Sequence, residues 1–159
     1  MPVNIELREV APADLPFFFE NQRDPEAVWM AAFTAKDPND RKAFDTHWAR
    51  ILADDTVMNR TILFEGQVVG SVSSYVMEHE PEVSYWIGRE FWGKGIATAA
   101  LAEFLTIQTA RPIFARVAEG NPGSLRVLEK CGFQIIGKDK GFANARGAEI
   151  EEFILKLSA

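Results

Sequence analysis

The chain has 159 residues, 47% of them hydrophobic, which suits one soluble domain, residues 1–159, with a sizeable core. A formal net charge of -6 disfavours nucleic acid as a partner, because phosphate backbones are bound by an excess of lysine and arginine. Its single cysteine, Cys131, rules out an intramolecular disulfide, no apolar run could cross a membrane and no apolar signal sequence is present, so we expect a cytoplasmic setting.

The first part of the chain predicts one strand followed by short helices. Residues 5–10 alternate like a strand, residues 14–21 form a short helix rich in phenylalanine, and a second helical piece surrounds Trp29. Asp37 followed by Pro38 is typical of the start of a third helix, whose apolar residues recur at helical spacing. These helices place many aromatic residues in the first third of the chain.

The middle of the chain predicts an antiparallel meander and then a crossover. Residues 61–64 and 67–75 read as a β-hairpin, and residues 82–87 as a further strand. A glycine turn leads into a helix over residues 96–109, and residues 113–117 form a short strand. Strand, helix and strand at this point make a parallel crossover.

The last part of the chain predicts a helix and two closing strands. Asn121 opens the helix, which ends at Gly132, and the strands span residues 133–136 and 150–157. The fold class is therefore α/β (α+β), with a mixed, mainly antiparallel sheet flanked by helices. The closing strands could pair with those of a second copy to form a homodimer.

The glycine turn after residues 82–87 has the geometry of an anion cradle. Gly93 and Gly95 have no Cβ, so their backbone can approach a ligand closely, and the next helix aims its free N–H groups at it. Such a site suits a phosphate or pyrophosphate. Lys94 can simply be a solvated lysine, since the cradle needs only its backbone. Neither a Walker loop nor the dinucleotide fingerprint fits the turn.

Two ordered motifs carry a family resemblance. The run Trp92-Gly93-Lys94-Gly95-Ile96-Ala97 lies where one family has its pyrophosphate loop, with Trp92 in place of the usual glutamine or arginine. The segment from Asn121 to Phe133 resembles that family's last helix, which contains an asparagine and ends in Lys-x-Gly-Phe. The chain thus resembles the GCN5-related N-acetyltransferase (GNAT) superfamily over essentially its whole length. It looks closest to the branch that acetylates N-terminal amines of ribosomal proteins, the RimJ/RimL-like branch.

The resemblance implies acetyl-CoA as the acyl donor, no metal, and a small-molecule or peptide amine as the acceptor. The main chain after the glycine turn would take the pyrophosphate, and the preceding strand would pair with the pantetheine amides. Asn121 would bond the pantetheine or the amine, although capping of its helix alone also explains this residue. The cofactor residues implied are Tyr85, Trp86, Ile87, Gly93, Lys94, Gly95, Ile96, Ala97, Thr98 and Asn121.

The catalytic residues implied are Glu82 and Ser124. Glu82 is the candidate base that deprotonates the amine, with Glu80 and His79 as alternates, but it could equally position a cationic amine by charge. Ser124 resembles the serine of the N-terminal-amine branch and could bond the leaving sulfur, or only support the helix start. It matters because Leu128 stands where many family members carry a tyrosine acid.

Two other functions fit the same loop. A non-catalytic acyl-CoA-binding sensor or interaction module would need the loop without the chemistry, and a different nucleotide-phosphate binder would use the loop alone. Cys131 and His47 fit ordinary core or surface positions. The acceptor itself is not named by the sequence, because the early helices and residues 137–147 would set its specificity.

Overall fold

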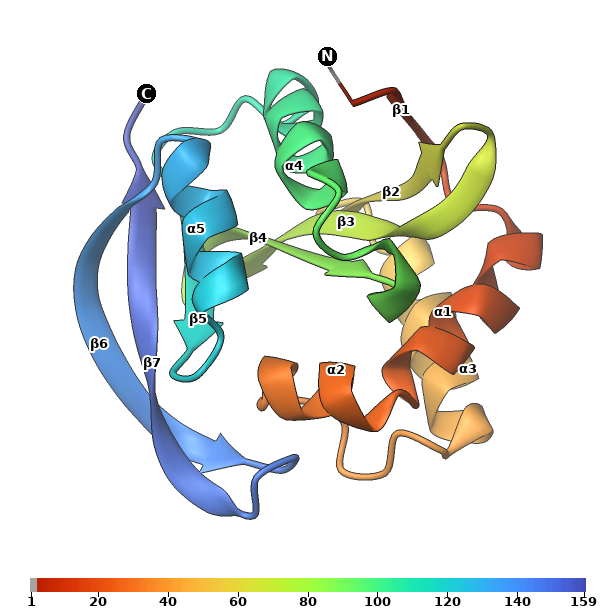
Figure 1. Ribbon diagram of the computed structural model, residues 1–159, viewed down its shortest axis with the longest axis horizontal. Helices are drawn as coiled ribbons and strands as arrows, with labels where there is room; N and C mark the ends of the chain where they lie inside the picture. The colour runs from red at the N-terminus through yellow and green to blue at the C-terminus, as the bar shows by residue number, and fades with distance from the viewer. Residues whose placement is uncertain (1–2) are drawn as a thin grey trace.

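The computed structural model describes residues 3–159 and shows a seven-stranded sheet with helices on both faces (Figure 1). The strand order is β1-β2-β3-β4-β5-β7-β6. In chain order the elements are β1 (Ile5–Arg8), a 3-10 turn (Pro12–Asp14), α1 (Leu15–Gln22), α2 (Pro25–Ala31), α3 (Arg41–Leu52), β2 (Met58–Phe64), β3 (Gln67–Met77), β4 (Glu80–Ile87), a 3-10 turn (Arg89–Phe91), α4 (Ile96–Ile107), β5 (Ile113–Ala118), α5 (Pro122–Lys130), β6 (Gln134–Ala143) and β7 (Ala148–Leu157).

The sheet is mixed, as predicted. β1 to β4 form an antiparallel meander, and β5, β7 and β6 form a second antiparallel group. β4 and β5 join the two groups as a parallel pair, and α4 is the crossover between them. The predicted parallel crossover is therefore confirmed, and it lies at the centre of the sheet.

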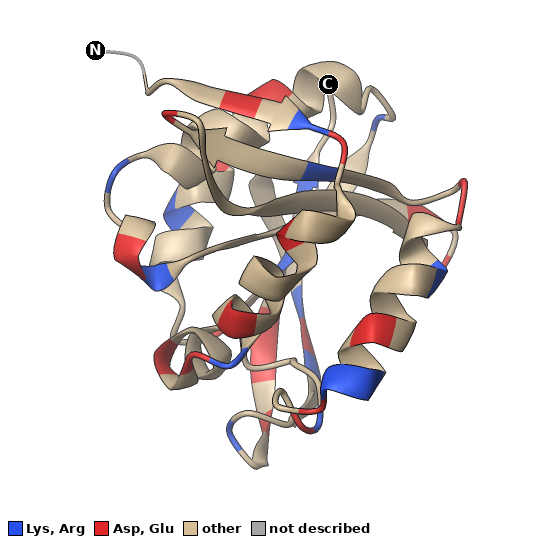
Figure 2. Cartoon of the chain, turned by 90° about the vertical axis from the view of Figure 1, so that its right-hand side faces the viewer, with Lys and Arg blue, Asp and Glu red and all other residues tan. Residues whose placement is uncertain are grey.

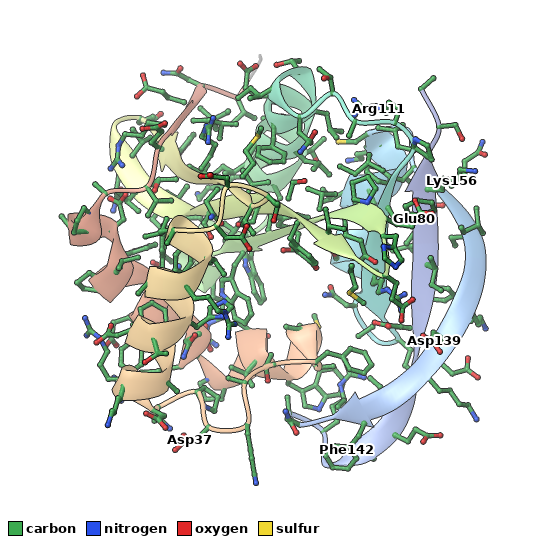
Figure 3. The ribbon with its side chains drawn as sticks, turned by 180° about the vertical axis from the view of Figure 1, so that it is seen from behind. Asp37, Glu80, Arg111, Asp139, Phe142 and Lys156 are labelled. Carbon is green, nitrogen blue, oxygen red and sulfur yellow. The ribbon has the colours of Figure 1, made fainter. Side chains whose placement is uncertain are left out.

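The two faces of the sheet carry different helices, as alternation along β3 shows. Val69 belongs to the main core, which includes Leu101 and Phe104 of α4 and Leu128 of α5. Its neighbour Val68 points to the opposite face and packs on the aromatic cluster of α1 and α3. Figures 1 and 3, drawn from opposite sides, show α4 and α5 on one face and α3 on the other.

The helix α3 is amphipathic, which is why it covers the sheet. Phe44 and Trp48 are buried one turn apart, while Arg41 and Asp45 pair on the exposed side at 3.0 Å. Figure 2 shows acidic and basic residues following one another along this helix. The aromatic side chains of α3 therefore face the sheet, and its charged side chains face solvent.

The predicted start of α3 was wrong by one turn. The N-cap is Asp40, whose Oδ1 accepts from the main-chain N–H of Ala43 at 3.0 Å. Asp37 instead accepts from the N–H of Asn39 at 3.0 Å, which makes a local turn before the helix (Figure 3). Two aspartates three residues apart both match the capping pattern, and the chain uses the later one.

The predicted first closing strand was too short. β6 runs over Gln134–Ala143 rather than residues 133–136, and Phe133 is a buried core residue that precedes it. Lys138, Asp139 and Lys140 interrupt the apolar pattern in the sequence. Such charged residues are common on an edge strand, where β6 lies, because they discourage pairing with other chains.

Candidate functional site

The sheet opens between β4 and β5. Within residues 3–159, the parallel pairing of β4 with β5 consists of one residue pair, Glu82 opposite Phe114. β5 pairs instead with β7 along its whole length, from Ile113 to Ala118. The C-terminal half of β4 therefore turns an edge without a neighbouring strand toward this opening.

The turn after β4 holds two glycines in the left-handed region. The φ angle is 77° at Gly93 and 78° at Gly95, a conformation that glycine adopts without steric cost. A Cβ built on Gly93 would meet no atom within 4 Å, so the backbone there borders open space. α4 begins at Ile96, and the N–H groups of its first turn have no partner within the helix. The turn therefore offers main-chain donors and the positive end of a helix dipole to an anion.

A cavity of about 490 Å³ extends from this turn between β4 and α5. The predicted cofactor residues that line it are Tyr85, Trp86, Ile87, Gly93, Gly95, Ile96, Ala97, Thr98 and Asn121. Lys94 is exposed and lies outside the lining. Arg126 and Lys130 of α5 also line the cavity, although the motifs did not single them out. Their spacing of four, which puts both cations on one helix face, is the signal that could have found them.

Trp92 ties the glycine turn to the end of β4. Its indole Nε1 donates to the main-chain oxygen of Ile87 at 2.9 Å. Because that carbonyl already has a donor and the Trp86 carbonyl points toward Gly70 of β3, the main chain of Tyr85 is what this edge of β4 can offer to an extended ligand. The tryptophan at this position, unusual in the family pattern, therefore holds the turn in place.

Tyr85 and Ser124 meet where β4 passes the start of α5. The tyrosine hydroxyl lies 2.9 Å from Ser124 Oγ, and either oxygen can donate. Burial raises the pKa of Tyr85 to about 12, so the phenol stays neutral near pH 7. Leu128 is buried in the main core. The phenol beside Ser124 is therefore that of Tyr85 on β4, whereas position 128 of α5, where many family members carry a tyrosine, is a leucine.

Asn121 uses both ends of its side-chain amide. Its Oδ1 accepts from the main-chain N–H of Ser124 at 3.3 Å, which caps α5 as the sequence predicts. Its Nδ2 donates to the main-chain oxygen of Met30 at 3.3 Å, which ties α5 to α2. Asn121 therefore fixes the position of Ser124 relative to α2.

A second cavity, of about 850 Å³, lies under α1, α2 and α3 on the other face of the sheet. The residues that line both cavities are Ala31, Tyr85, Trp86, Asn121 and Ser124. The cavities meet at these residues, in the opening between β4 and β5. Ligands bound in the two cavities would therefore come together beside Tyr85 and Ser124.

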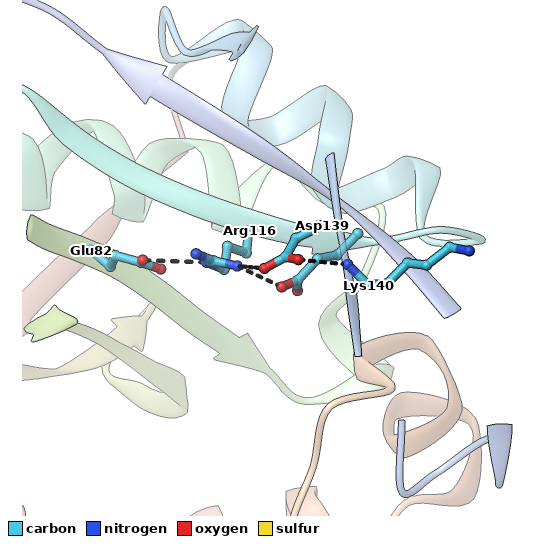
Figure 4. Close-up of polar contacts among 5 residues, drawn as sticks. Glu82, Arg116, Asp139 and Lys140 are labelled. Carbon is cyan, nitrogen blue, oxygen red and sulfur yellow. Dashed lines mark hydrogen bonds and ion pairs between the residues drawn. The ribbon is translucent and has the colours of Figure 1, made fainter. Parts of the chain in front are cut away.

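Arg116 of β5 gathers three carboxylates at the second cavity (Figure 4). Its Nε lies 3.3 Å from Glu82, and its Nη1 lies 3.1 Å from Asp139 and 2.8 Å from Glu152. Glu82 is buried, and burial raises its pKa against the opposing effect of the guanidinium. Three carboxylates around one guanidinium leave an excess of negative charge here.

Glu152 and Arg116 were missing from the predicted site, and both line the second cavity. Their contact depends on the β5–β7 register, which no local pattern reveals. Glu82 lies behind Arg116 and lines neither cavity. The predicted alternates His79 and Glu80 are exposed at the β3–β4 hairpin and also line neither cavity.

The turn between β6 and β7 contacts the end of α2. That end of α2 lines both cavities. The Arg146 guanidinium lies 3.8 Å from the centre of the Trp29 ring, and its Nε donates to the main-chain oxygen of Trp29 at 3.0 Å. Asn144 Nδ2 donates to the main-chain oxygen of Thr34 at 2.8 Å. Residues 143–147 thus position the segment that carries Ala31, the residue shared by both cavities.

Residues 4–134 match the family described as "Acetyltransferase (GNAT) domain". The chain belongs to this family. The glycine turn and the asparagine-capped α5 are the parts of this GNAT chain on which the resemblance was predicted, and the membership is confirmed.

Known proteins similar to this GNAT chain include the putative ribosomal N-acetyltransferase YdaF of Bacillus subtilis, 32% identical over 121 residues, or 69% of this chain and 65% of YdaF. The match thus spans just under two thirds of that relative. Mycobacterium smegmatis RimJ in complex with CoA-disulfide has a TM-score of 0.82 at 23% identity, covering 98% of this chain and 82% of RimJ. Spermidine N-acetyltransferase from Vibrio cholerae, in complex with CoA and spermine, has a TM-score of 0.82 at 19% identity, covering 97% and 95%. The solved structures confirm the predicted fold, and YdaF agrees with the predicted branch.

Proposed function

We propose that this GNAT chain transfers the acetyl group of acetyl-CoA to a primary amine, with both substrates bound at once. The observation that carries the proposal is the meeting of two cavities at Tyr85 and Ser124. One cavity starts at a main-chain anion cradle, and the other is bordered by a carboxylate cluster. This arrangement suits a phosphate-bearing donor on one side and a cationic amine on the other.

The first cavity fits coenzyme A in three respects. The main chain at Gly93 to Thr98 would take the diphosphate, since Gly93 leaves the approach open. Arg126 and Lys130 would add positive charge at the same cavity. The free edge of β4 at Tyr85 would pair with the pantetheine amides. RimJ and spermidine N-acetyltransferase, which share this fold, are known in complexes with CoA-disulfide and CoA.

The acceptor must be neutral to attack, and this sets an energetic preference among amines. Deprotonating an amine of pKa near 10.4 at pH 7 costs about 4.6 kcal/mol, whereas deprotonating an α-amine of pKa near 8 costs about 1.4 kcal/mol. The nitrogen bonds to the thioester carbonyl carbon, the carbon–sulfur bond breaks, and the nitrogen loses a proton. An α-amine, such as a protein or peptide N-terminus, therefore asks least of the protein's base.

We assign the proton transfer to the cluster around Arg116. Glu82 is the proposed base, and its raised pKa suits a proton acceptor better than that of an ordinary carboxylate. Because Glu82 lies behind Arg116, it would act through water or through Glu152, which borders the cavity. Glu152 would attract the ammonium form of the acceptor before the proton leaves.

Ser124 would stabilise the departing sulfur. Its hydroxyl is held between Tyr85 on β4 and the capped start of α5. If Tyr85 donates to Ser124, the serine proton is free to point at the sulfur. No covalent intermediate with the protein is needed, and the alignment of the two substrates provides much of the acceleration.

The test is release of free CoA thiol from acetyl-CoA with a panel of amines and peptides. Thiol release that depends on the acceptor, with an acetylated product of matching mass, would support the proposal. CoA binding without turnover across the panel would favour a non-catalytic acyl-CoA sensor instead. Equal binding of ADP and CoA would favour a general nucleotide-phosphate binder, because only CoA can use the edge of β4.

Partners beyond the acceptor stay predictions, including a homodimer through the closing strands and a cytoplasmic setting. Within residues 3–159, none of the helices has both the length and the hydropathy needed to cross a bilayer. The edge strand β6 is the part of the sheet through which a second copy could pair.

A further inference from the structure

The second cavity is lined by polar side chains such as Asn21, Asn59 and Ser73 and by several aromatic rings. Those that line it away from the junction are Phe18, Phe33, Phe44, Trp48 and Tyr75. We propose that the acceptor is a primary amine with a single positive charge, attached to a bulky apolar body that fills this aromatic chamber. The inference rests on the proposed acetyl transfer and names the class of amine that it uses.

Several rings of the chamber pack on one another. Phe18 stacks on Trp48 with ring centres 5.1 Å apart, and Phe44 lies 6.1 Å from Trp48. All three side chains are buried in the cluster that joins α1 and α3 to the sheet. A volume of about 850 Å³ is more than a short alkyl amine would fill. An apolar body placed there would lose its contact with water without rearranging the protein.

The charges on the cavity wall exclude other kinds of acceptor. Among residues 3–159, Arg116 is the only lysine or arginine that lines the cavity. Its guanidinium is already paired with three carboxylates, so no free cation remains there to bind a phosphate or carboxylate group of an acceptor. Glu152 is the carboxylate that lines it. His47 lies on the far wall, where burial and then the nearby Arg50 lower its pKa, so it is neutral near pH 7.

This distribution also argues against a polyamine. A polyamine carries several positive charges along its length, and each would need an acceptor or water. The cavity offers its carboxylate at one end, beside the junction with the first cavity, and aromatic faces toward α3. A single ammonium at Glu152 and an apolar body against Phe18 and Trp48 match both ends.

The experiment compares four acceptors in the thiol-release assay: phenylalaninamide, alaninamide, spermidine, and a peptide that begins with phenylalanine. Each kcat/KM is divided by the fraction of neutral amine at the assay pH, so that amine acidity does not enter the comparison. We expect phenylalaninamide to exceed both alaninamide and spermidine by at least about tenfold, since a buried phenyl ring contributes that much. The peptide arm distinguishes a free small amine from the end of a chain.

A charge placed on the apolar wall gives a second readout. Phe33 is 38% exposed and lines the cavity, so Phe33→Glu should be tolerated while adding a carboxylate where the apolar body lies. We expect Phe33→Glu to lower the preference for phenylalaninamide over spermidine by at least about tenfold. Phe142→Glu is the control: this residue is 63% exposed on β6, lines neither cavity, and lies near the tip of the hairpin (Figure 3). It should leave the preference unchanged.

The possible results distinguish failure of the aromatic-chamber assignment from failure of the proposed acetyl transfer. A preference for spermidine or alaninamide in the wild-type protein, or a Phe33→Glu variant with unchanged selectivity, would overturn the aromatic-chamber assignment and leave acetyl transfer intact. Silence with every acceptor despite tight CoA binding would overturn the transfer reaction, and the inference with it.

Discussion

The contact between Tyr85 and Ser124 predicts that the phenol supports catalysis without giving up its proton. The hydroxyls lie 2.9 Å apart at the point where the two cavities meet. Two roles fit such a pair. The phenol can protonate the departing sulfur, directly or through the serine, or it can orient the serine by a hydrogen bond. The pKa of Tyr85 decides between them.

Burial raises that pKa to about 12, whereas a thiol has a pKa near 8.5. Moving a proton from the phenol to the thiolate is therefore uphill by about 3.5 pKa units, or roughly 4.8 kcal/mol. A neutral hydrogen bond contributes about 0.5–1.5 kcal/mol, so Tyr85→Phe should lower kcat by about two- to tenfold. Loss of a true proton donor would lower it by about 10²–10⁴-fold.

The assay is thiol release at saturating acetyl-CoA and acceptor, for Tyr85→Phe, Ser124→Ala and the double variant. Because the two residues share one hydrogen bond, the double variant should be about as slow as the slower single variant. CoA affinity, measured by calorimetry, is the control for an intact donor site. A fall in kcat of about 100-fold or more for Tyr85→Phe would show that the phenol is a proton donor, and additive losses in the double variant would show that the two hydroxyls act separately; either result contradicts the prediction.

Two carboxylates with shifted pKa values, Asp14 and Glu82, can be tested by substitution. Hydrogen bonds from Arg8 hold the pKa of buried Asp14 at about 2, below its usual 3.8. This depressed pKa stabilises the fold by about 2.4 kcal/mol above pH 4, a contribution lost as the pH falls through about 2. Urea unfolding at pH 7 should therefore show Asp14→Asn about 2 kcal/mol less stable, and a difference below about 0.5 kcal/mol would contradict this. Glu82→Gln should lower kcat/KM by at least about 100-fold and, once kcat/KM is divided by the fraction of neutral amine, remove the remaining loss of activity at low pH, because the raised pKa of Glu82 would set that part of the limb. A pH–rate profile checks this, and a change within about threefold would exclude Glu82 as the base.

Most of the fold could be predicted from the sequence, because the residue patterns that indicate its turns, caps and strands are local. The glycine turn at Gly93, the asparagine cap of α5 and the alternating strands each depend on neighbours within a few residues. Capping alone did not fix the start of α3, since Asp37 and Asp40 both match the pattern. The length of β6 was missed because an edge strand needs no apolar face, and Lys138 to Lys140 read as a loop.

Only part of the candidate site could be predicted from the sequence. The contacts that were not predicted depend on the strand order and register of the sheet. The contacts of Arg116 with Glu82 and Glu152 join three strands, and their side chains meet only once β5 lies between β4 and β7. The pairing of Tyr85 with Ser124 likewise joins residues 39 positions apart. Most of the donor cavity is lined by two local motifs, the β4–α4 turn and the start of α5, whereas the acceptor cavity is assembled from more elements distant in sequence.

In the proposed function, the glycine turn holds the diphosphate of coenzyme A. Gly93 and Gly66 form a matched pair for testing it, since both have a left-handed φ, 77° and 80°, and a Cβ on either would meet no atom within 4 Å. Gly93 lines the donor cavity, whereas Gly66 lies in the β2–β3 hairpin turn.

The decisive measurement is the CoA affinity of Gly93→Leu and Gly66→Leu by isothermal titration calorimetry. Both variants carry the same backbone strain, but only the first places a side chain in the donor cavity. We predict that Gly66→Leu binds CoA like the wild-type protein and that Gly93→Leu binds at least about tenfold more weakly. Equal affinity in the two variants would contradict the assignment of the diphosphate to this turn.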